Sequence, residues 1–355
     1  MKRVVPDYYA DFACVAGACR HTCCVGWEID IDPDSLRRYQ AMPGEMGERL
    51  RSYIDIEETP HFRLTADERC PLLNTNGLCD LITAAGQDAL CQICADHPRF
   101  RNILSDRDET GLGLCCEAAA SLILKEKQPV RLLISEGSGP KRHLSRKDAA
   151  MLQKRDLWIT AAQDRTLSID VRIARLCEME ALQLPACGWA DWAQLYLNLE
   201  RLDPAWEKEL TLLCSEKAAV PPTDEALEIA LEQLLVYLLY RHIAAAEDAH
   251  ELRPRLAFCL LARSCLCVLP LCTRRKLLLP WMIFANCRAC IPLKLNTLRR
   301  IWMHCWTRCG MYNHTVYQLY SAMRTTSLPF LLWPSTPRYC ARPYPRTEIT
   351  CPSRS

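Results

Sequence analysis

The stretch Cys14-Val15-Ala16-Gly17-Ala18-Cys19-Arg20-His21-Thr22-Cys23-Cys24 places four thiols within eleven residues near the N-terminus. Thiolates are soft ligands that suit zinc and iron–sulfur clusters. Six more cysteines follow by residue 116, so ten lie in the first third of the chain. We interpret these ten as candidate metal ligands: Cys14, Cys19, Cys23, Cys24, Cys70, Cys79, Cys91, Cys94, Cys115 and Cys116. The segments around them are then the scaffold of a metal or iron–sulfur site.

The spacing of these cysteines leaves the choice of ligands open. A structural zinc site usually combines a Cys-x2-Cys pair with a second pair further along the chain. Cys91 and Cys94 form one such pair, and an Asn-Gly turn between Cys70 and Cys79 favours a knuckle with two short strands. Where two cysteines are adjacent, their side chains point to opposite sides of an extended segment. We therefore expect one cysteine of each adjacent pair to be a ligand and the other a small buried hydrophobe.

Isolated cysteines and two histidines are interpreted differently. A lone cysteine is more often part of a hydrophobic core than a ligand, and we expect this of Cys177, Cys187 and Cys214. The imidazoles of His21 and His97 could bind a metal, but we expect local hydrogen bonding or surface positions for both.

The composition indicates a reduced, intracellular protein. Pro6, Asp7 and Asp11 interrupt the apolar segment that a signal peptide would need. No clean apolar run reaches the length of about 18 residues that suggests a membrane span. We therefore expect a cytoplasmic protein, in which clustered thiols more often bind metal than form disulfides.

The charge of the 355-residue chain reverses at one point. Residues 1–251 carry 28 Lys and Arg against 41 Asp and Glu, whereas residues 252–355 carry 16 against one, so the net charges are −13 and +15. The second segment also holds ten cysteines and ten prolines, and we expect the prolines to break any long helix. We interpret it as an aberrant, poorly ordered tail that a frameshift near residue 251 produced. The alternative is a genuine basic tail for anionic partners, and resequencing the encoding DNA distinguishes the two.

We expect a mainly α fold with short β elements around the cysteines. Ile29 and Ile31 alternate with aspartates as in a short strand, and Pro33 suits the first turn of a helix that follows Asp32. Residues 43–69 are polar and turn-rich. Helices are expected over 80–94, from about 117 to 125, over 145–162 with Ser145 as its cap, over 166–184 and 189–202, and from Pro221 onward.

Three domains follow from these patterns. The first is a cysteine-rich metal or iron–sulfur domain at 1–130, and the second is a helical domain at 131–251. The aberrant tail occupies 252–355.

Several of the motifs together resemble a known family. They are Cys-x4-Cys-x3-Cys-Cys near the N-terminus, Cys70-Pro71-Leu72-Leu73 with Cys79, and Cys94 with His97-Pro98-Arg99. This set resembles the zinc- or iron-chelating proteins built on eight cysteines. Val5-Pro6-Asp7-Tyr8-Tyr9, Cys23-Cys24-Val25-Gly26-Trp27 and the helical second half are similar to the flagellin lysine-N-methylases of enterobacteria. The resemblance covers roughly residues 1–251.

The resemblance implies an enzyme that transfers a methyl group from S-adenosylmethionine to flagellin lysines in the cytoplasm. It also implies an oxygen-sensitive 4Fe-4S cluster. The matching positions are Cys14, Cys19, Cys23, Cys24, Cys70, Cys79, Cys94 and Cys115 or Cys116. Because such a cluster takes up to four thiolates, they form a pool of candidates. We expect no nucleic-acid partner, and we leave peripheral membrane association and a homo-oligomer open.

The residues alone do not predict methyl transfer. A Rossmann-type methyltransferase has a Gly-rich turn between a strand and a helix. The one candidate, at 135–139, is followed by Pro140, Lys141 and Arg142 where an apolar helix face should start. The Cys-x3-Cys-x2-Cys triad of radical enzymes is also absent. The cysteines by themselves fit two other functions, a non-catalytic zinc- or iron-binding protein and a redox sensor whose adjacent cysteines oxidise.

Overall fold

The structure is a computed structural model that describes residues 1–20, 22–57, 59–184 and 225–273, with isolated positions between 190 and 214. Of residues 263–273 it describes the backbone. The strands are β1 (Lys2–Pro6), β2 (Ile29–Asp30), β3 (Ile54–Asp55), β4 (His61–Phe62), β5 (Arg99–Ile103), β6 (Arg107–Leu112) and β7 (Leu132–Glu136). The helices are α1 (Pro33–Ala41), α2 (Gly44–Tyr53), α3 (Asp80–Ala85), α4 (Gln92–Asp96), α5 (Glu117–Lys125), α6 (Arg146–Ala162), α7 (Ile169–Met179), α10 (Glu225–Ile243) and α11 (Leu252–Thr273). Helix predominates, as predicted, beside two small sheets.

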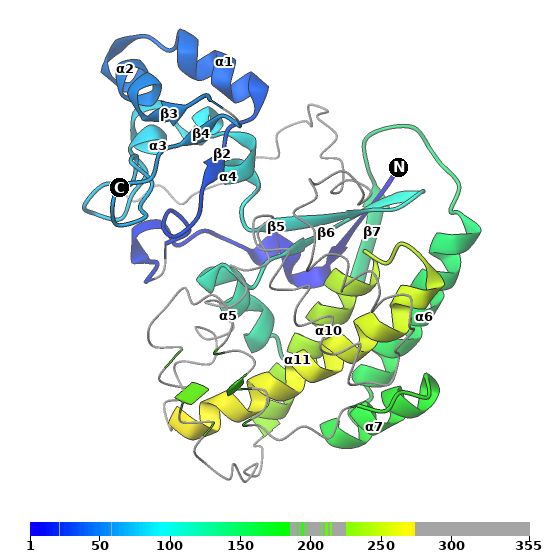
Figure 1. The fold of residues 1–355 in the computed structure, drawn as a ribbon. Coiled ribbons are helices and arrows are strands. Elements are labelled where there is room, and N and C mark those ends of the chain that lie inside the picture. Colours follow the sequence, from blue (N-terminus) through cyan, green and yellow to red (C-terminus); the bar gives the residue numbers. More distant parts are fainter. Residues whose placement is uncertain are drawn as a thin grey trace, which may run out of the picture.

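Two hydrophobic cores organise the described chain (Figure 1). The core of the small lobe is built by α1 to α3, the three-stranded sheet β2-β4-β3 and the segment that leads into α4. The core of the large lobe joins the four-stranded sheet β5-β6-β1-β7 to α5, α6, α10 and α11. Residues 1–12 and 99–125 therefore share a core with α6 and α10. The predicted domains at 1–130, 131–251 and 252–355 were meant as independently folding units, and these limits stay predictions.

One face of the four-stranded sheet packs on α10. β1 pairs in parallel with β6 and antiparallel with β7, and β5 pairs antiparallel with β6. Side chains alternate between the two faces of each strand. Phe100 of β5 lies on the helical side, with its ring centroid 6.1 and 6.0 Å from those of Tyr237 and Tyr240 of α10. The alternate residues of the same strands therefore face away from the helices.

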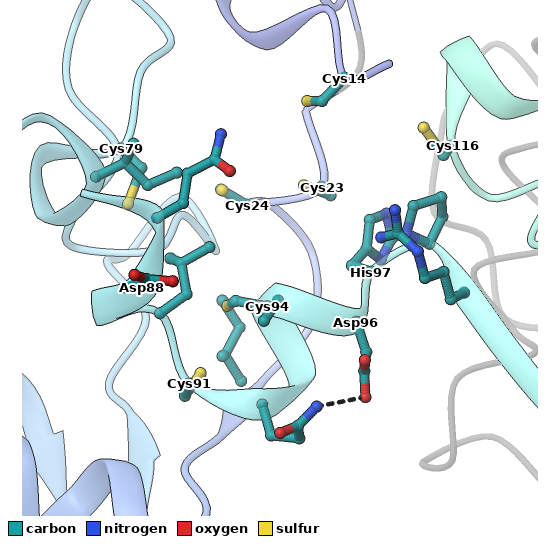
Figure 2. A pocket seen from close by; sticks show the side chains of 18 of the residues that line it. Cys14, Cys23, Cys24, Cys79, Asp88, Cys91, Cys94, Asp96, His97 and Cys116 are labelled. Atoms are coloured by element: carbon teal, nitrogen blue, oxygen red, sulfur yellow. Dashed lines mark hydrogen bonds between the residues drawn. The ribbon is translucent and has the colours of Figure 1, made fainter. Parts of the chain in front are cut away.

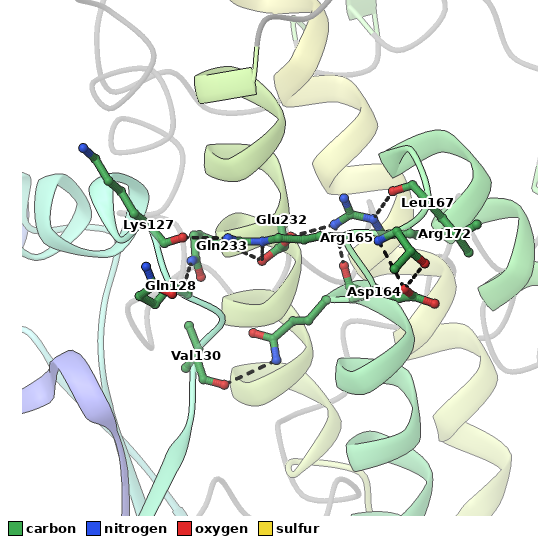
Figure 3. A network of polar contacts seen from close by, with 12 residues as sticks. Lys127, Gln128, Val130, Asp164, Arg165, Leu167, Arg172, Glu232 and Gln233 are labelled. Atoms are coloured by element: carbon green, nitrogen blue, oxygen red, sulfur yellow. Dashed lines mark hydrogen bonds and ion pairs between the residues drawn. The ribbon is translucent and has the colours of Figure 1, made fainter.

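Buried ion pairs hold the large lobe together. Glu109 of β6 pairs with Arg155 of α6, and both side chains are buried. Glu232 of α10 accepts hydrogen bonds from Arg165 at 2.9 Å and from Arg172 at 2.6 Å, as Figure 3 shows. Because an unpaired buried charge is strongly destabilising, these contacts fix how the sheet, α6 and α7 sit on α10.

Helix starts were predicted well from local signals. The side chains of Asp32 and Ser145 cap α1 and α6, and α6 has the predicted bounds. Within the predicted range 166–184 the structure has a shorter helix, α7, from Ile169 to Met179. Most of the helix expected over 189–202, and the start expected at Pro221, lie outside the described residues.

Two local predictions are wrong. The stretch 43–69 contains the helix α2 in place of turns, because Leu50 is buried in the small-lobe core and anchors it there. The single helix expected over 80–94 is divided, because Gly86 adopts a positive φ of 80° at the end of α3. The chain then re-enters helical structure only at α4.

The prediction that prolines break any long helix after residue 251 is wrong for α11, which runs from Leu252 to Thr273. Pro254 lies in its first turn, where the missing N–H has no intrahelical acceptor to lose. The apolar side chains of α11 near Leu256 and Leu260 are buried in the large-lobe core. Among the described helices, α11 included, none has the length and apolar character needed to cross a membrane. Residues 274–355 lie outside the described residues, and the frameshift stays a prediction.

Asp32 couples α1 to the start of α4. Its carboxylate accepts hydrogen bonds from Ser35 N at 2.9 Å and from Gln92 N at 2.8 Å. Partial burial alone would raise the pKa of Asp32, but the hydrogen bonds from Gln92 and Ser35 outweigh it and lower the pKa below its ordinary value of 3.8.

Replacing Asp32 with alanine should lower the free energy of unfolding at neutral pH by about 1–2 kcal/mol, because two backbone donors lose their acceptor. A carboxyl whose folded-state pKa is lowered stabilises the fold above its unfolded-state pKa of about 3.9, and this contribution is lost as pH falls through the folded-state pKa. Urea unfolding of wild type and Asp32→Ala should therefore show a stability difference that shrinks in acid. An equal difference at neutral and acidic pH would contradict the hydrogen-bonded carboxylate.

Candidate metal centre and substrate cleft

A large cleft brings all ten predicted cysteines together. It has a volume of about 1410 Å³, and its lining residues come from the small lobe and from the helix-free face of the four-stranded sheet. Figure 2 shows thiols from several segments of the chain around this space. The cysteines that line it are Cys14, Cys19, Cys23, Cys24, Cys70, Cys79, Cys91, Cys94, Cys115 and Cys116.

Half of these cysteines belong to the small-lobe core, and we call them the small-lobe thiols: Cys24, Cys70, Cys79, Cys91 and Cys94. The Cys70 N–H donates a hydrogen bond to Cys24 O at 2.8 Å, which joins the first cysteine segment to the second. The predicted knuckle forms a single bridge between Leu73 and Cys79 instead of two strands. Burial, together with the thiolates of Cys24, Cys79 and Cys91, raises the pKa of Cys70 to about 12. Thiols from separate segments therefore share one electrostatic environment.

Two pairs of thiols are hydrogen-bonded to each other. The hydrogen bond from Cys94 lowers the pKa of Cys91, and the hydrogen bond from Cys23 lowers the pKa of Cys24 to about 7. The pKa values of Cys23 and Cys94 are raised, chiefly because each thiol donates its proton to its neighbour. Each pair thus contains one cysteine that loses its proton more readily, and the thiolate is the form that binds metal.

The other five cysteines lie where the first cysteine segment meets α5, and we call them the junction thiols: Cys14, Cys19, Cys23, Cys115 and Cys116. Glu117 of α5 holds this segment, because it accepts hydrogen bonds from Arg20 N at 3.0 Å, from Arg20 Nε at 2.7 Å and from Cys19 Sγ at 3.8 Å. The thiolates of Cys14 and Cys116 act on Cys23, and Figure 2 shows Cys116 on the side of Cys23 away from Cys79. The adjacent Cys23 and Cys24 therefore belong to different groups.

The donor chemistry of the cleft fits a thiolate-bound metal or cluster. All thirteen cysteines whose side chains the structure describes are free thiols. Thiolates that converge from separate segments are the ligands that zinc and iron–sulfur clusters require. Within the described part of the chain, however, no three His, Cys, Asp or Glu side chains stand close enough together to hold a metal ion. The thiols line one cleft, and the assignment of individual ligands stays a prediction.

Of the remaining candidates, His97 lines the same cleft as the thiols, and the others lie away from it or outside the described residues. The His97 ring lies 6.2 Å from the Trp27 ring, centroid to centroid. Cys177 packs against the large-lobe core, as expected, and Cys214 is half-buried. His21 and Cys187 fall outside the described residues.

The wall of the cleft that faces the thiols was not predicted from the sequence. Arg99 and Arg101 of β5, Asp108 and Thr110 of β6, and Arg3 of β1 line the cleft from the helix-free face of the sheet. In the sequence these residues only alternate with Phe100, Asn102 and Glu109. That alternation is the signal that could have revealed two strands with one polar face.

Curated proteins share part of this sequence. The chain is 27% identical to "Lysine-N-methylase" of Salmonella choleraesuis (strain SC-B67) over 134 residues, which are 36% of this chain and 33% of that protein. "Lysine-N-methylase" of Salmonella typhimurium matches to the same extent. "Flagellar biosynthetic protein FliU" of Salmonella muenchen is 26% identical over 145 residues, 39% of this chain and 85% of that protein.

No family model and no solved structure matches the chain. The chain spans about a third of the length of the lysine-N-methylases that it matches. The resemblance predicted from the cysteine motifs is thereby confirmed as a partial similarity to proteins named lysine-N-methylase.

Proposed function

We propose that this protein is an S-adenosylmethionine-dependent lysine N-methyltransferase that acts on flagellin and depends on a cysteine-bound 4Fe-4S cluster. The observation that carries the proposal is the convergence of all ten predicted cysteines on one cleft with a polar opposite wall. The names of the partly similar proteins support the methyl transfer and the flagellar substrate. We propose that the reaction takes place in the cytoplasm.

The small-lobe thiols are the ligands that we propose for the cluster, with zinc as the alternative metal. They share one buried core, and their segments are joined through the backbone of Cys24 and Cys70. When bound, a thiolate-held cluster with an open iron position supplies an anchor for the cofactor or a source of an electron. The junction thiols then flank the site, and Glu117 keeps their segment in place.

The wall opposite the thiols provides the groups that a lysine substrate needs. A lysine amine has a reference pKa near 10.4, so roughly one in a thousand is neutral at pH 7 and its proton must be removed before a polar transfer. Glu136 of β7, which lines the cleft from the same sheet, is an exposed carboxylate that can attract the ammonium. The net charge of −13 over residues 1–251 also favours lysine-bearing substrates.

The second candidate is a metal-binding or redox-sensing protein without catalysis. The hydrogen-bonded pairs Cys23–Cys24 and Cys91–Cys94 favour it, because neighbouring thiols of unequal pKa are prone to oxidation. Anaerobic purification separates the two candidates. A brown protein that contains iron and sulfide supports the cluster, and a colourless protein that contains zinc supports the alternative.

Methyl transfer itself is tested with the full-length chain expressed from DNA of verified reading frame. Anaerobic incubation with flagellin and methyl-labelled S-adenosylmethionine should give labelled methyl-lysine, measured by mass spectrometry of flagellin peptides. The same mixture without the chain is the control. A chain that retains its iron and sulfide but leaves every flagellin lysine unlabelled would refute the proposed activity.

A further inference from the structure

Two arginines gather around one tyrosine on the polar wall of the cleft. The guanidinium carbon Cζ of Arg3 lies 5.6 Å from the centroid of the Tyr9 ring, and that of Arg99 lies 5.9 Å from it. Arg99 Nε also donates a hydrogen bond to the Tyr9 hydroxyl at 3.0 Å, and its Cζ lies 5.5 Å from the Phe12 ring centroid. All four side chains line the cleft. Two positive charges are thus held in place by aromatic rings.

Neither Arg3 nor Arg99 has an acidic partner among the residues that the structure describes. Nearby basic side chains of the same sheet do: Arg101 pairs with Asp96 at 3.2 Å, and Arg107 pairs with Asp106 at 2.8 Å. Guanidinium groups prefer planar, bidentate anions, above all carboxylates and phosphates. The unbalanced pair therefore marks a site for an anion within the cleft.

The position of the pair indicates which anion it takes. Arg3 on β1 is the register partner of Asp108 on β6, so a carboxylate of the protein lies beside this part of the wall. A ligand with a carboxylate and an ammonium group close together matches both charges. A phosphate matches the arginines but is repelled by Asp108. The thiols line the same cleft, so a ligand held here faces them.

We propose that Arg3 and Arg99, held beside Tyr9, bind the carboxylate of the amino-acid end of S-adenosylmethionine. The proposal rests on the proposed function for the identity of the ligand. The α-ammonium of the same end then lies toward Asp108. This places the amino-acid end of the methyl donor on the sheet and leaves the rest of the molecule in the cleft opposite the thiols.

Binding of S-adenosylmethionine and of its decarboxylated analogue tests this site. Equilibrium dialysis uses the labelled ligands and the full-length chain, purified and reconstituted anaerobically. Wild type should bind the analogue at least about tenfold more weakly, because each charge-assisted hydrogen bond is worth a factor of ten or more. The double variant Arg3→Gln with Arg99→Gln should bind S-adenosylmethionine as weakly as the analogue. The matched control is Arg131→Gln, which removes an arginine that lies outside the cleft and pairs with Asp7. This variant should prefer S-adenosylmethionine over the analogue by the same factor as wild type.

The outcomes separate this site from the proposed function. A wild type that binds both ligands equally well, or a double variant that still discriminates between them, overturns the carboxylate site and leaves the methylase proposal standing. A wild type that binds neither ligand overturns both. The single variant Arg3→Gln controls for misfolding. Among the described residues, the Arg3 guanidinium contacts only the Tyr9 ring, so its replacement should disturb the fold little. The variant's preference for S-adenosylmethionine over the analogue should fall, while its midpoint temperature of thermal unfolding should stay close to that of wild type.

Discussion

The double variant Cys91→Ser with Cys94→Ser should lose most of its bound iron and sulfide. It removes the Cys-x2-Cys pair and leaves three of the five small-lobe thiols, the minimum for a cluster with one open iron position. A serine hydroxyl is a hard donor that keeps its proton at neutral pH, so it does not replace a thiolate. Iron and acid-labile sulfide per chain, determined after anaerobic reconstitution, measure the effect. We expect methyl transfer to flagellin to be lost in parallel.

The matched control removes two thiols from the junction. Cys14→Ser with Cys19→Ser takes away the same number of sulfurs from the same cleft but leaves every small-lobe thiol in place. It should retain the iron and sulfide of the wild type. If the junction variant loses its iron and the small-lobe variant retains it, the cluster lies at the junction and the proposed ligand set is wrong.

Replacing Glu109 with glutamine should lower the free energy of unfolding by about 3–5 kcal/mol, the largest effect on stability that we expect. Glu109 and Arg155 are both buried, so the variant leaves the arginine charge with only the exposed Asp156, 3.6 Å from its Nε, as an ion partner. Denaturant unfolding followed by far-UV circular dichroism measures the difference. The pair joins β6 to α6, so the loss also loosens the sheet that forms one wall of the cleft.

An exposed ion pair supplies the comparison for Glu109. Asp34 pairs with Arg37 on α1, and their side chains are 73% and 70% exposed. Asp34→Asn should therefore change the stability by less than about 1 kcal/mol. A double variant, Glu109→Gln with Arg155→Met, should recover part of the loss because no unpaired charge remains. If Glu109→Gln is as mild as Asp34→Asn, the buried pair does not hold β6 to α6.

The elements that sequence predicted are those whose signals are local. Asp32 and Ser145 predict the starts of α1 and α6, because an N-cap residue acts within one helical turn. The four-stranded sheet escaped prediction because β1 pairs with β6, about a hundred residues later, and no local pattern records that partner. The prediction that prolines prevent a long helix after residue 251 failed at α11 for a related reason. Pro254 does not disrupt α11, because it lies in the first turn of the helix. The packing of α11 on α10, which shows that a helix begins here, cannot be predicted from the local sequence.

The candidate site divides in the same way. Thiol chemistry predicted that the ten cysteines would act together, and one cleft does gather them. Five of the ten belong to the small-lobe core and the other five do not, and the spacing of the residues does not reveal that division. Arg3, Tyr9 and Arg99 come from two distant segments and carry no motif. They are recognised only in the folded chain, where Arg3 and Arg99 have no acidic partner among the described residues.

The proposed cluster ligands and the proposed carboxylate site put the cluster and the methyl donor in one cleft. Electron paramagnetic resonance of the reduced, anaerobically reconstituted full-length chain tests this arrangement most directly, with spectra recorded before and after saturation with S-adenosylmethionine. The account predicts an iron–sulfur signal whose shape changes when the donor binds. An unchanged signal at a donor concentration that dialysis shows to be saturating would contradict it, and so would a reconstituted chain that gives no iron–sulfur signal at all.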